Sequence, residues 1–167
     1  MYSVDQRDKV IELKQVPQSS VGAPMPVVLS DEFKVLLVYI VQETPADVDP
    51  GTADEPLALV EFTGYRSYMF GGLNDEAFHG HPLATRGLYP YGAFQIENSS
   101  WIRQLEKMNS VHPSHNPGRF ARLRHYVFSF HDSTFECVAN GYIISMHEGS
   151  LESMLPIMQS RLQRKRL

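Results

Sequence analysis

The chain has 167 residues, of which 43% are hydrophobic and 20% charged, a composition typical of globular proteins and not of disordered ones. Its 15 basic and 19 acidic residues give a net charge of −4, which argues against a nucleic-acid-binding protein. The single cysteine, Cys137, excludes an intramolecular disulfide, and the longest apolar run, 35–41, is too short to cross a membrane. With no signal-peptide pattern at the start, we expect one cytoplasmic domain over 1–167 that binds neither nucleic acid nor a membrane.

Short apolar runs bounded by turn residues predict strands in the first half of the chain. The first lies at 10–13 and the strongest at 35–41, where every residue is apolar, so both faces of that strand are expected to be covered. The acidic, proline-rich segment 43–56 is interpreted as a solvated excursion. A long strand, or two strands separated at Gly64, is expected at 57–70.

A further strand at 93–96 leads into an amphipathic helix after residue 98. Ser99 and Ser100 offer an N-terminal cap, and an apolar stripe follows at Trp101, Leu105 and Met108. Strands dominate the middle of the chain and helices lie late in it. The predicted class is therefore α+β, with a curved, mainly antiparallel sheet.

A C-terminal helix is predicted from about Ser150 or Ser153 onward. Pro156 would break a helix that begins at Ser150 but fits the first turn of one that begins at Ser153. The apolar stripe of this helix is expected at Leu151, Leu155, Met158 and Leu162.

The best-defined hairpin is expected between 123–131 and 134–147, with a two-residue turn at Asp132 and Ser133. The core face of the hairpin then consists of Tyr126, Phe128, Phe130, Phe135, Cys137 and Ala139. The polar face consists of His125, Val127, Ser129, His131, Thr134, Glu136, Val138 and Asn140. Because most antiparallel sheets have one wet face, we expect the polar face to be solvated, and the alternative is that it lines a pocket.

The segment 71–92 is rich in glycine and in ionisable side chains and has no regular period. Binding residues concentrate on irregular segments of this kind, so a binding surface is predicted from this loop and the polar face of the 123–147 hairpin. The candidate ligand-binding residues are Asp75, Glu76, His79, His81, Arg86, His125, His131 and Glu136.

His79 and His81 form an H-x-H pair. On an extended segment such residues point the same way and can bind one divalent metal ion, with an acidic residue or a hairpin histidine completing the site. The chain could therefore be an enzyme with a His/Glu site that works with a metal or by acid–base catalysis. No complete catalytic constellation is visible, so a non-catalytic binding module is preferred. Its ligand would be a small molecule or a protein partner, and a homodimer is the expected state.

Three stretches of the sequence resemble a family of uncharacterised bacterial proteins. They are NDEAFHGHPL at 74–83, NSSWIR at 98–103 and HDSTFEC at 131–137. The resemblance implies a bacterial, cytoplasmic protein and no particular activity.

Overall fold

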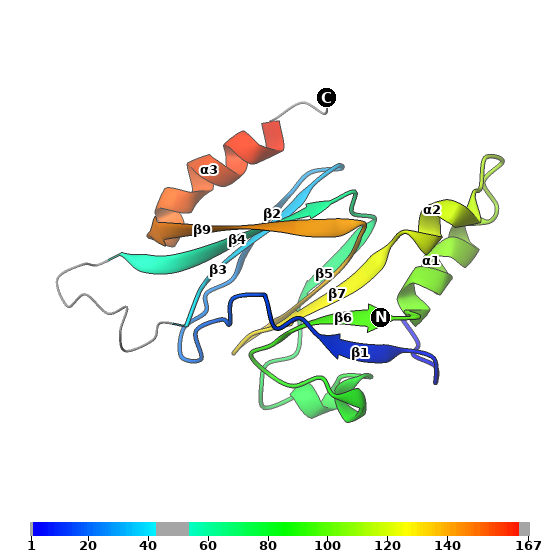
Figure 1. Ribbon diagram of the computed structural model, residues 1–167, viewed down its shortest axis with the longest axis horizontal. Coiled ribbons are helices and arrows are strands. Elements are labelled where there is room, and N and C mark those ends of the chain that lie inside the picture. The colour runs from blue at the N-terminus through cyan, green and yellow to red at the C-terminus, as the bar shows by residue number, and fades with distance from the viewer. Residues whose placement is uncertain (1, 43–53, 164–167) are drawn as a thin grey trace.

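The computed structural model describes residues 2–42 and 54–163. The acidic excursion was expected at 43–56, and its residues 43–53 lie outside the described ranges. The described residues form nine strands in two antiparallel sheets, together with three α-helices (Figure 1). The predicted α+β class with antiparallel strands is confirmed, and the strands divide between two sheets. None of the described helices is long and apolar enough to cross a membrane.

The strands have the following bounds. The five-stranded sheet contains, in spatial order, β1 (Lys9–Glu12), β6 (Ala93–Glu97), β7 (Arg124–Ser129), β8 (Thr134–Ala139) and β5 (Ser67–Gly71). The four-stranded sheet contains β2 (Val27–Ser30), β3 (Val35–Ile40), β4 (Glu55–Thr63) and β9 (Gly141–Gly149). The helices are α1 (Ser100–Asn109), α2 (Pro117–Ala121) and α3 (Leu151–Gln163).

The two sheets pack face to face over one aromatic core. Phe62 of the four-stranded sheet contacts the rings of Phe128 and Phe135 across the interface, with ring centroids 5.8 Å and 5.3 Å away. Helix α3 covers the outer face of the four-stranded sheet (Figure 1). β3 is buried at every position because it lies between this helix and the core, as its unbroken apolar sequence predicted.

The hairpin of β7 and β8 turns one residue earlier than predicted. Phe128 pairs with Phe135, and the N–H of Phe130 donates to the carbonyl of Ser133 at 2.9 Å, so the turn consists of His131 and Asp132. The pairing register moves by two residues, and a shift of two leaves each side chain on its own face. The predicted core face is therefore confirmed.

The second strand of this hairpin is shorter than predicted. β8 ends at Ala139, and β9 begins at Gly141 and pairs with β4 in the other sheet. Thr134 to His147 is thus two strands, one in each sheet.

The prediction of a solvated polar face is wrong. His125 and Val127 have no exposed surface, and Glu136 is 7% exposed. Phe78 and Leu83 of the 71–92 loop pack on Val127, and other residues from the N-terminus and α1 pack further along the same face. The loop covers this face because its apolar residues are buried by packing against the sheet. The sequence did not predict this cover, since the apolar residues of the loop lie among many polar ones and follow no regular period.

The helices differ from the predictions at their apolar stripes. Ser99 caps α1 as expected, but Met108 on the last turn is 62% exposed. α3 begins at Leu151, since the Ser150 hydroxyl accepts the N–H of Ser153 at 3.2 Å in the manner of a cap, and Pro156 therefore lies inside the helix. The buried residues of α3 are Met154 and Met158, whereas Leu155 is 42% exposed.

Candidate functional site

The 71–92 loop and the hairpin meet in a buried hydrogen-bond network centred on Glu136. Its Oε2 lies 2.8 Å from Nε2 of His125 and accepts the hydroxyl of Tyr2 at 2.7 Å. Its Oε1 lies 3.4 Å from Nε2 of His81, which comes from the loop. Ser99, at the start of α1, completes the network with its hydroxyl 3.0 Å from Nδ1 of His125. We call these five residues the Glu136 network.

The hydrogen bonds assign a donor to each contact. The backbone N–H of Leu83 donates to Nδ1 of His81 at 3.1 Å, so the proton of the neutral ring is on Nε2 and faces Glu136. A carboxylate only accepts hydrogen bonds, so Nε2 of His125 carries a proton and donates to Glu136. Nδ1 of the neutral His125 ring then accepts the hydroxyl of Ser99, whose oxygen accepts an N–H from the first turn of α1. Every buried polar group of the network is thereby satisfied.

Glu136 is held as a carboxylate. Burial acts to raise its pKa, but the hydrogen bonds from His125, His81 and Tyr2 outweigh burial and lower the pKa to about 2. Burial, followed by the negative charge of Glu136, raises the pKa of the Tyr2 hydroxyl, which therefore stays protonated. The network is a buried anion surrounded by three donors.

Ser99, His125 and Glu136 form a chain of the residue types that serine hydrolases use. Ser99 borders a groove of about 700 Å³ along α1 and α2, but only 3% of the residue is exposed. Its hydroxyl is engaged with His125 and with the N–H of Ile102. His125 has no exposed surface, and a substrate therefore cannot reach the base. We assign these three residues a structural role, in which they fasten α1 to the sheet.

Asp75 and His131 lie together at a different place. The Tyr91 hydroxyl donates to the Asp75 carboxylate, and this bond lowers the pKa of Asp75 and raises that of Tyr91 to about 12. The His131 ring lies 6.3 Å from the Tyr91 ring, and its hydrogen bond to Asp132 raises its pKa. Two of the predicted binding residues thus hold Tyr91 in place.

The remaining predicted residues do not join the Glu136 network. Glu76 and His79 are exposed, whereas His81 is buried, so the H-x-H pair does not point to one side. Arg86 donates to the backbone carbonyls of Asp5 and Asp8 and fastens the N-terminal segment to the loop. Within 2–42 and 54–163, no group of three or more His, Cys, Asp or Glu residues has the geometry to hold a metal ion.

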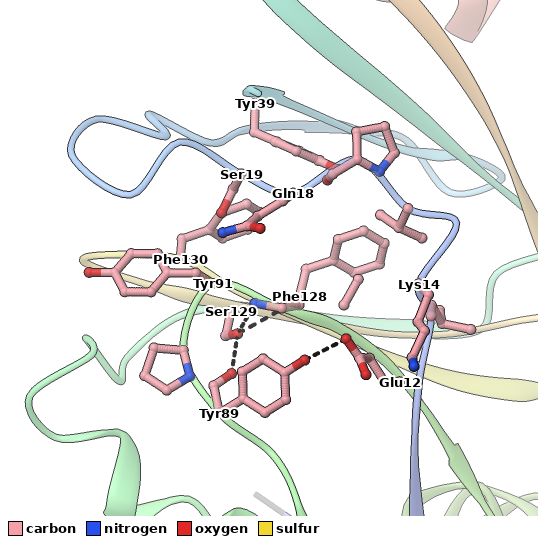
Figure 2. A pocket seen from close by; sticks show the side chains of 16 residues that line it. Glu12, Lys14, Gln18, Ser19, Tyr39, Tyr89, Tyr91, Phe128, Ser129 and Phe130 are labelled. Carbon is pink, nitrogen blue, oxygen red and sulfur yellow. Dashed lines mark hydrogen bonds between the residues drawn. The ribbon is translucent and has the colours of Figure 1, made fainter. Parts of the chain in front are cut away.

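A cavity of about 300 Å³ opens at one end of the core, where β3, β6, β7 and the segment 12–19 meet. We call it the end cavity. Five of its sixteen lining residues are aromatic, namely Tyr39, Tyr89, Tyr91, Phe128 and Phe130. Its polar side chains are Glu12, Lys14, Gln18, Ser19 and Ser129. Figure 2 shows Ser19 and Gln18 on one side of the cavity and Tyr89 and Ser129 on the other.

Most polar groups of the end cavity already have protein partners. Tyr89 donates to Glu12 at 2.6 Å, Tyr39 donates to a backbone carbonyl at 2.7 Å, and Ser129 donates to the carbonyl of Tyr89 at 2.8 Å. The hydroxyl of Ser19 differs, because it is buried and has no hydrogen-bond partner among the described residues. A buried hydroxyl without a partner costs about 1–3 kcal/mol, so it requires a partner such as an ordered water or a ligand.

The backbone at the cavity is also strained. Tyr91 has a φ of +62°, in the left-handed region that a residue with a large side chain rarely adopts. Such strain persists where neighbouring contacts impose it, and it concentrates at ligand-binding sites. Here the contacts are the hydrogen bond to Asp75 and the ring of His131.

The sequence offered no strong signal for the end cavity. Its residues come from four separate stretches, and Ser19 lies in a segment whose composition indicates only a loop. Tyr2 of the Glu136 network was missed for the same reason, since a single tyrosine near the N-terminus has no distinguishing pattern. The clustered tyrosines around 89–91 were the one visible signal.

In comparisons with known proteins, no protein-family model, no curated protein and no solved structure matched this chain. The resemblance to an uncharacterised bacterial family stays a prediction.

Proposed function

We propose that this chain is a non-catalytic binding protein that holds a small planar molecule in the end cavity. The observation that carries the proposal is the Ser19 hydroxyl, which is buried in a cavity wall without a partner. The Ser19 oxygen itself has almost no exposed surface, so a ligand would pair with it once the side chain turns toward the cavity, and this would remove the cost of the unpaired hydroxyl. The volume of about 300 Å³ is at the lower end of small-molecule sites.

The lining indicates the chemistry of the ligand. The rings of Tyr89 and Tyr91 keep exposed surface and favour a flat body, whereas Phe128 and Phe130 are almost fully buried. Glu12 and Lys14 contribute one charge of each sign, so a neutral or zwitterionic molecule is favoured over one with a large net charge. The proposed ligand is an aromatic molecule of one or two rings with a polar edge that faces Ser19.

The proposal modifies the expected binding surface. Most of the 71–92 loop packs on the polar hairpin face and closes it, and only its end at 89–92 borders the end cavity. A cytoplasmic location belongs to the same proposal and agrees with Cys137, a buried free thiol.

The test is a screen of phenols, indoles and nucleobases by protein-observed amide NMR. We expect hits whose amide chemical-shift changes map to 12–19, 89–93 and 128–130. A screen without hits, or hits that map to other parts of the chain, would overturn the proposal.

A pair of serine variants tests the Ser19 assignment. Ser19→Ala removes an unsatisfied hydroxyl, so we expect it to raise the free energy of unfolding by about 1 kcal/mol while weakening the best hit about tenfold. Ser129→Ala is the matched control on the opposite side of the same cavity (Figure 2). Its hydroxyl accepts the N–H of Gly92 at 3.0 Å and donates to Tyr89, so its loss should destabilise the protein. Equal destabilisation by both variants would contradict the assignment.

A further inference from the structure

A third concave site, distinct from the end cavity and from the groove along α1 and α2, lies beside α2. It is a hollow of about 190 Å³ between the α1–α2 connection and the residue that precedes β5. Its polar lining consists of Arg66, Asn109, His112, Ser114, Asn116 and Arg119. No carboxylate contributes to this lining.

The internal hydrogen bonds of this hollow occupy acceptors and leave donors free. The Oδ1 atom of Asn109 accepts from the His115 ring at 3.1 Å, and that of Asn116 accepts the N–H of Gly118 at 2.9 Å. The amide NH₂ group of each asparagine therefore remains as a donor.

His112 follows the same pattern. Its Nδ1 accepts the N–H of Ser114 at 3.0 Å, so the proton of its neutral ring is on Nε2. The guanidinium groups of Arg66 and Arg119 form no ion pair with a carboxylate among the described residues. The free groups of the lining are thus donors, two of them cationic.

The charge distribution of the whole chain supports the same conclusion. Residues 109–124, which include most of the lining, carry three basic side chains and no acidic one, although the chain as a whole is acidic. A cationic region on an acidic molecule draws anions toward itself and repels them elsewhere.

We propose that this hollow binds a phosphate group. Arginine and amide donors match the oxygens of a phosphate, and two guanidinium groups offset its charge. The volume of about 190 Å³ equals the liquid volume of about six water molecules, which suits the five heavy atoms of a phosphate and few others. The bound group is free phosphate or the phosphate of a small monoester.

The test is an amide NMR titration of the full chain in a low-salt buffer without oxyanions, first with inorganic phosphate and then with glycerol phosphate. We expect saturable shifts at 66 and across 109–119. Saturation by phosphate with weaker binding of the ester identifies the free ion, and tighter binding of the ester identifies a phosphorylated metabolite. The absence of saturable shifts with both compounds overturns the proposal.

Variants that each remove one positive charge distinguish a specific phosphate site from non-specific electrostatic attraction of phosphate to the surface. Arg119→Gln and Arg66→Gln each remove a guanidinium from the lining, so the affinity should fall about tenfold. Arg122→Gln removes the same charge from an exposed residue outside the lining, and the affinity should change by less than about twofold. An equal loss in all three variants would overturn the proposal in favour of diffuse electrostatics.

Discussion

Glu136 shows how one buried charge can join three distant parts of the chain. Its carboxylate binds Tyr2 from the N-terminus, His81 from the loop and His125 from the neighbouring strand. Burying an anion is unfavourable, and here the donors offset that cost and lower the pKa of Glu136 to about 2. The network therefore stabilises the fold only while Glu136 is ionised.

This dependence predicts a specific effect of acid on stability. The pKa of Glu136 falls from its ordinary value of 4.5 in the unfolded chain to about 2 in the folded one. The unfolded state takes up the proton first as pH falls, so the stabilisation is complete above pH 4.5 and is lost toward pH 2. The loss attributable to Glu136 should be about 3 kcal/mol, measured by urea unfolding at a series of pH values.

Glu136→Gln isolates this contribution from that of the other carboxylates. The variant should be less stable than the wild type at pH 7, because an amide is a poorer acceptor than a carboxylate for three donors. The two free energies of unfolding should converge as pH falls through the window from 4.5 to 2. Parallel pH profiles would show that Glu136 is not the titrating group.

At the scale of elements, α3 shows an apolar stripe that the sequence predicted except at one position, Leu155. Met158 has no exposed surface, whereas Leu155 is 42% exposed. Met158→Ala should lower the free energy of unfolding by about 2–4 kcal/mol, and Leu155→Ala, the control, by less than about 1 kcal/mol. Thermal or urea unfolding of both variants measures the difference, and similar losses would mean that α3 packs through another face.

The elements themselves could largely be predicted from the sequence. β3 was evident because a strand covered on both sides is apolar at every position, and the core face of β7 and β8 was evident because strand periodicity survives a two-residue error in the turn. The start of α3 was ambiguous because Ser150 and Ser153 are equally good caps by residue type.

The candidate sites were harder to predict because they depend on tertiary contacts. His81, His125 and Glu136, three of the predicted binding residues, do meet in the structure, yet their burial under the 71–92 loop could not be derived from alternation alone. Periodicity shows which side chains share a face of the sheet, and it does not show what covers that face. The partnerless hydroxyl of Ser19 is likewise a property of the packed molecule.

At the scale of the whole molecule, the two sheets share one core and should unfold together. Phe62 of the four-stranded sheet packs against four aromatic rings, those of Tyr126, Phe128, Phe135 and Tyr142. Trp101 lies on the opposite side of the five-stranded sheet, so its fluorescence reports on structure that Phe62 does not touch. If the shared core couples the two sheets, a substitution at Phe62 must also shift the unfolding transition that Trp101 fluorescence reports.

Phe62→Ala should therefore lower the free energy of unfolding by about 3–5 kcal/mol and shift the Trp101 fluorescence transition as far as the transition seen by circular dichroism. Phe33→Ala removes the same atoms from a residue that is 53% exposed and serves as the control, with an expected loss below about 1 kcal/mol. If the Trp101 transition stayed in place while the circular dichroism transition moved, the sheets would be separate folding units. Coincident transitions follow from the physical arrangement, because neither sheet can keep its aromatic face out of water without the other.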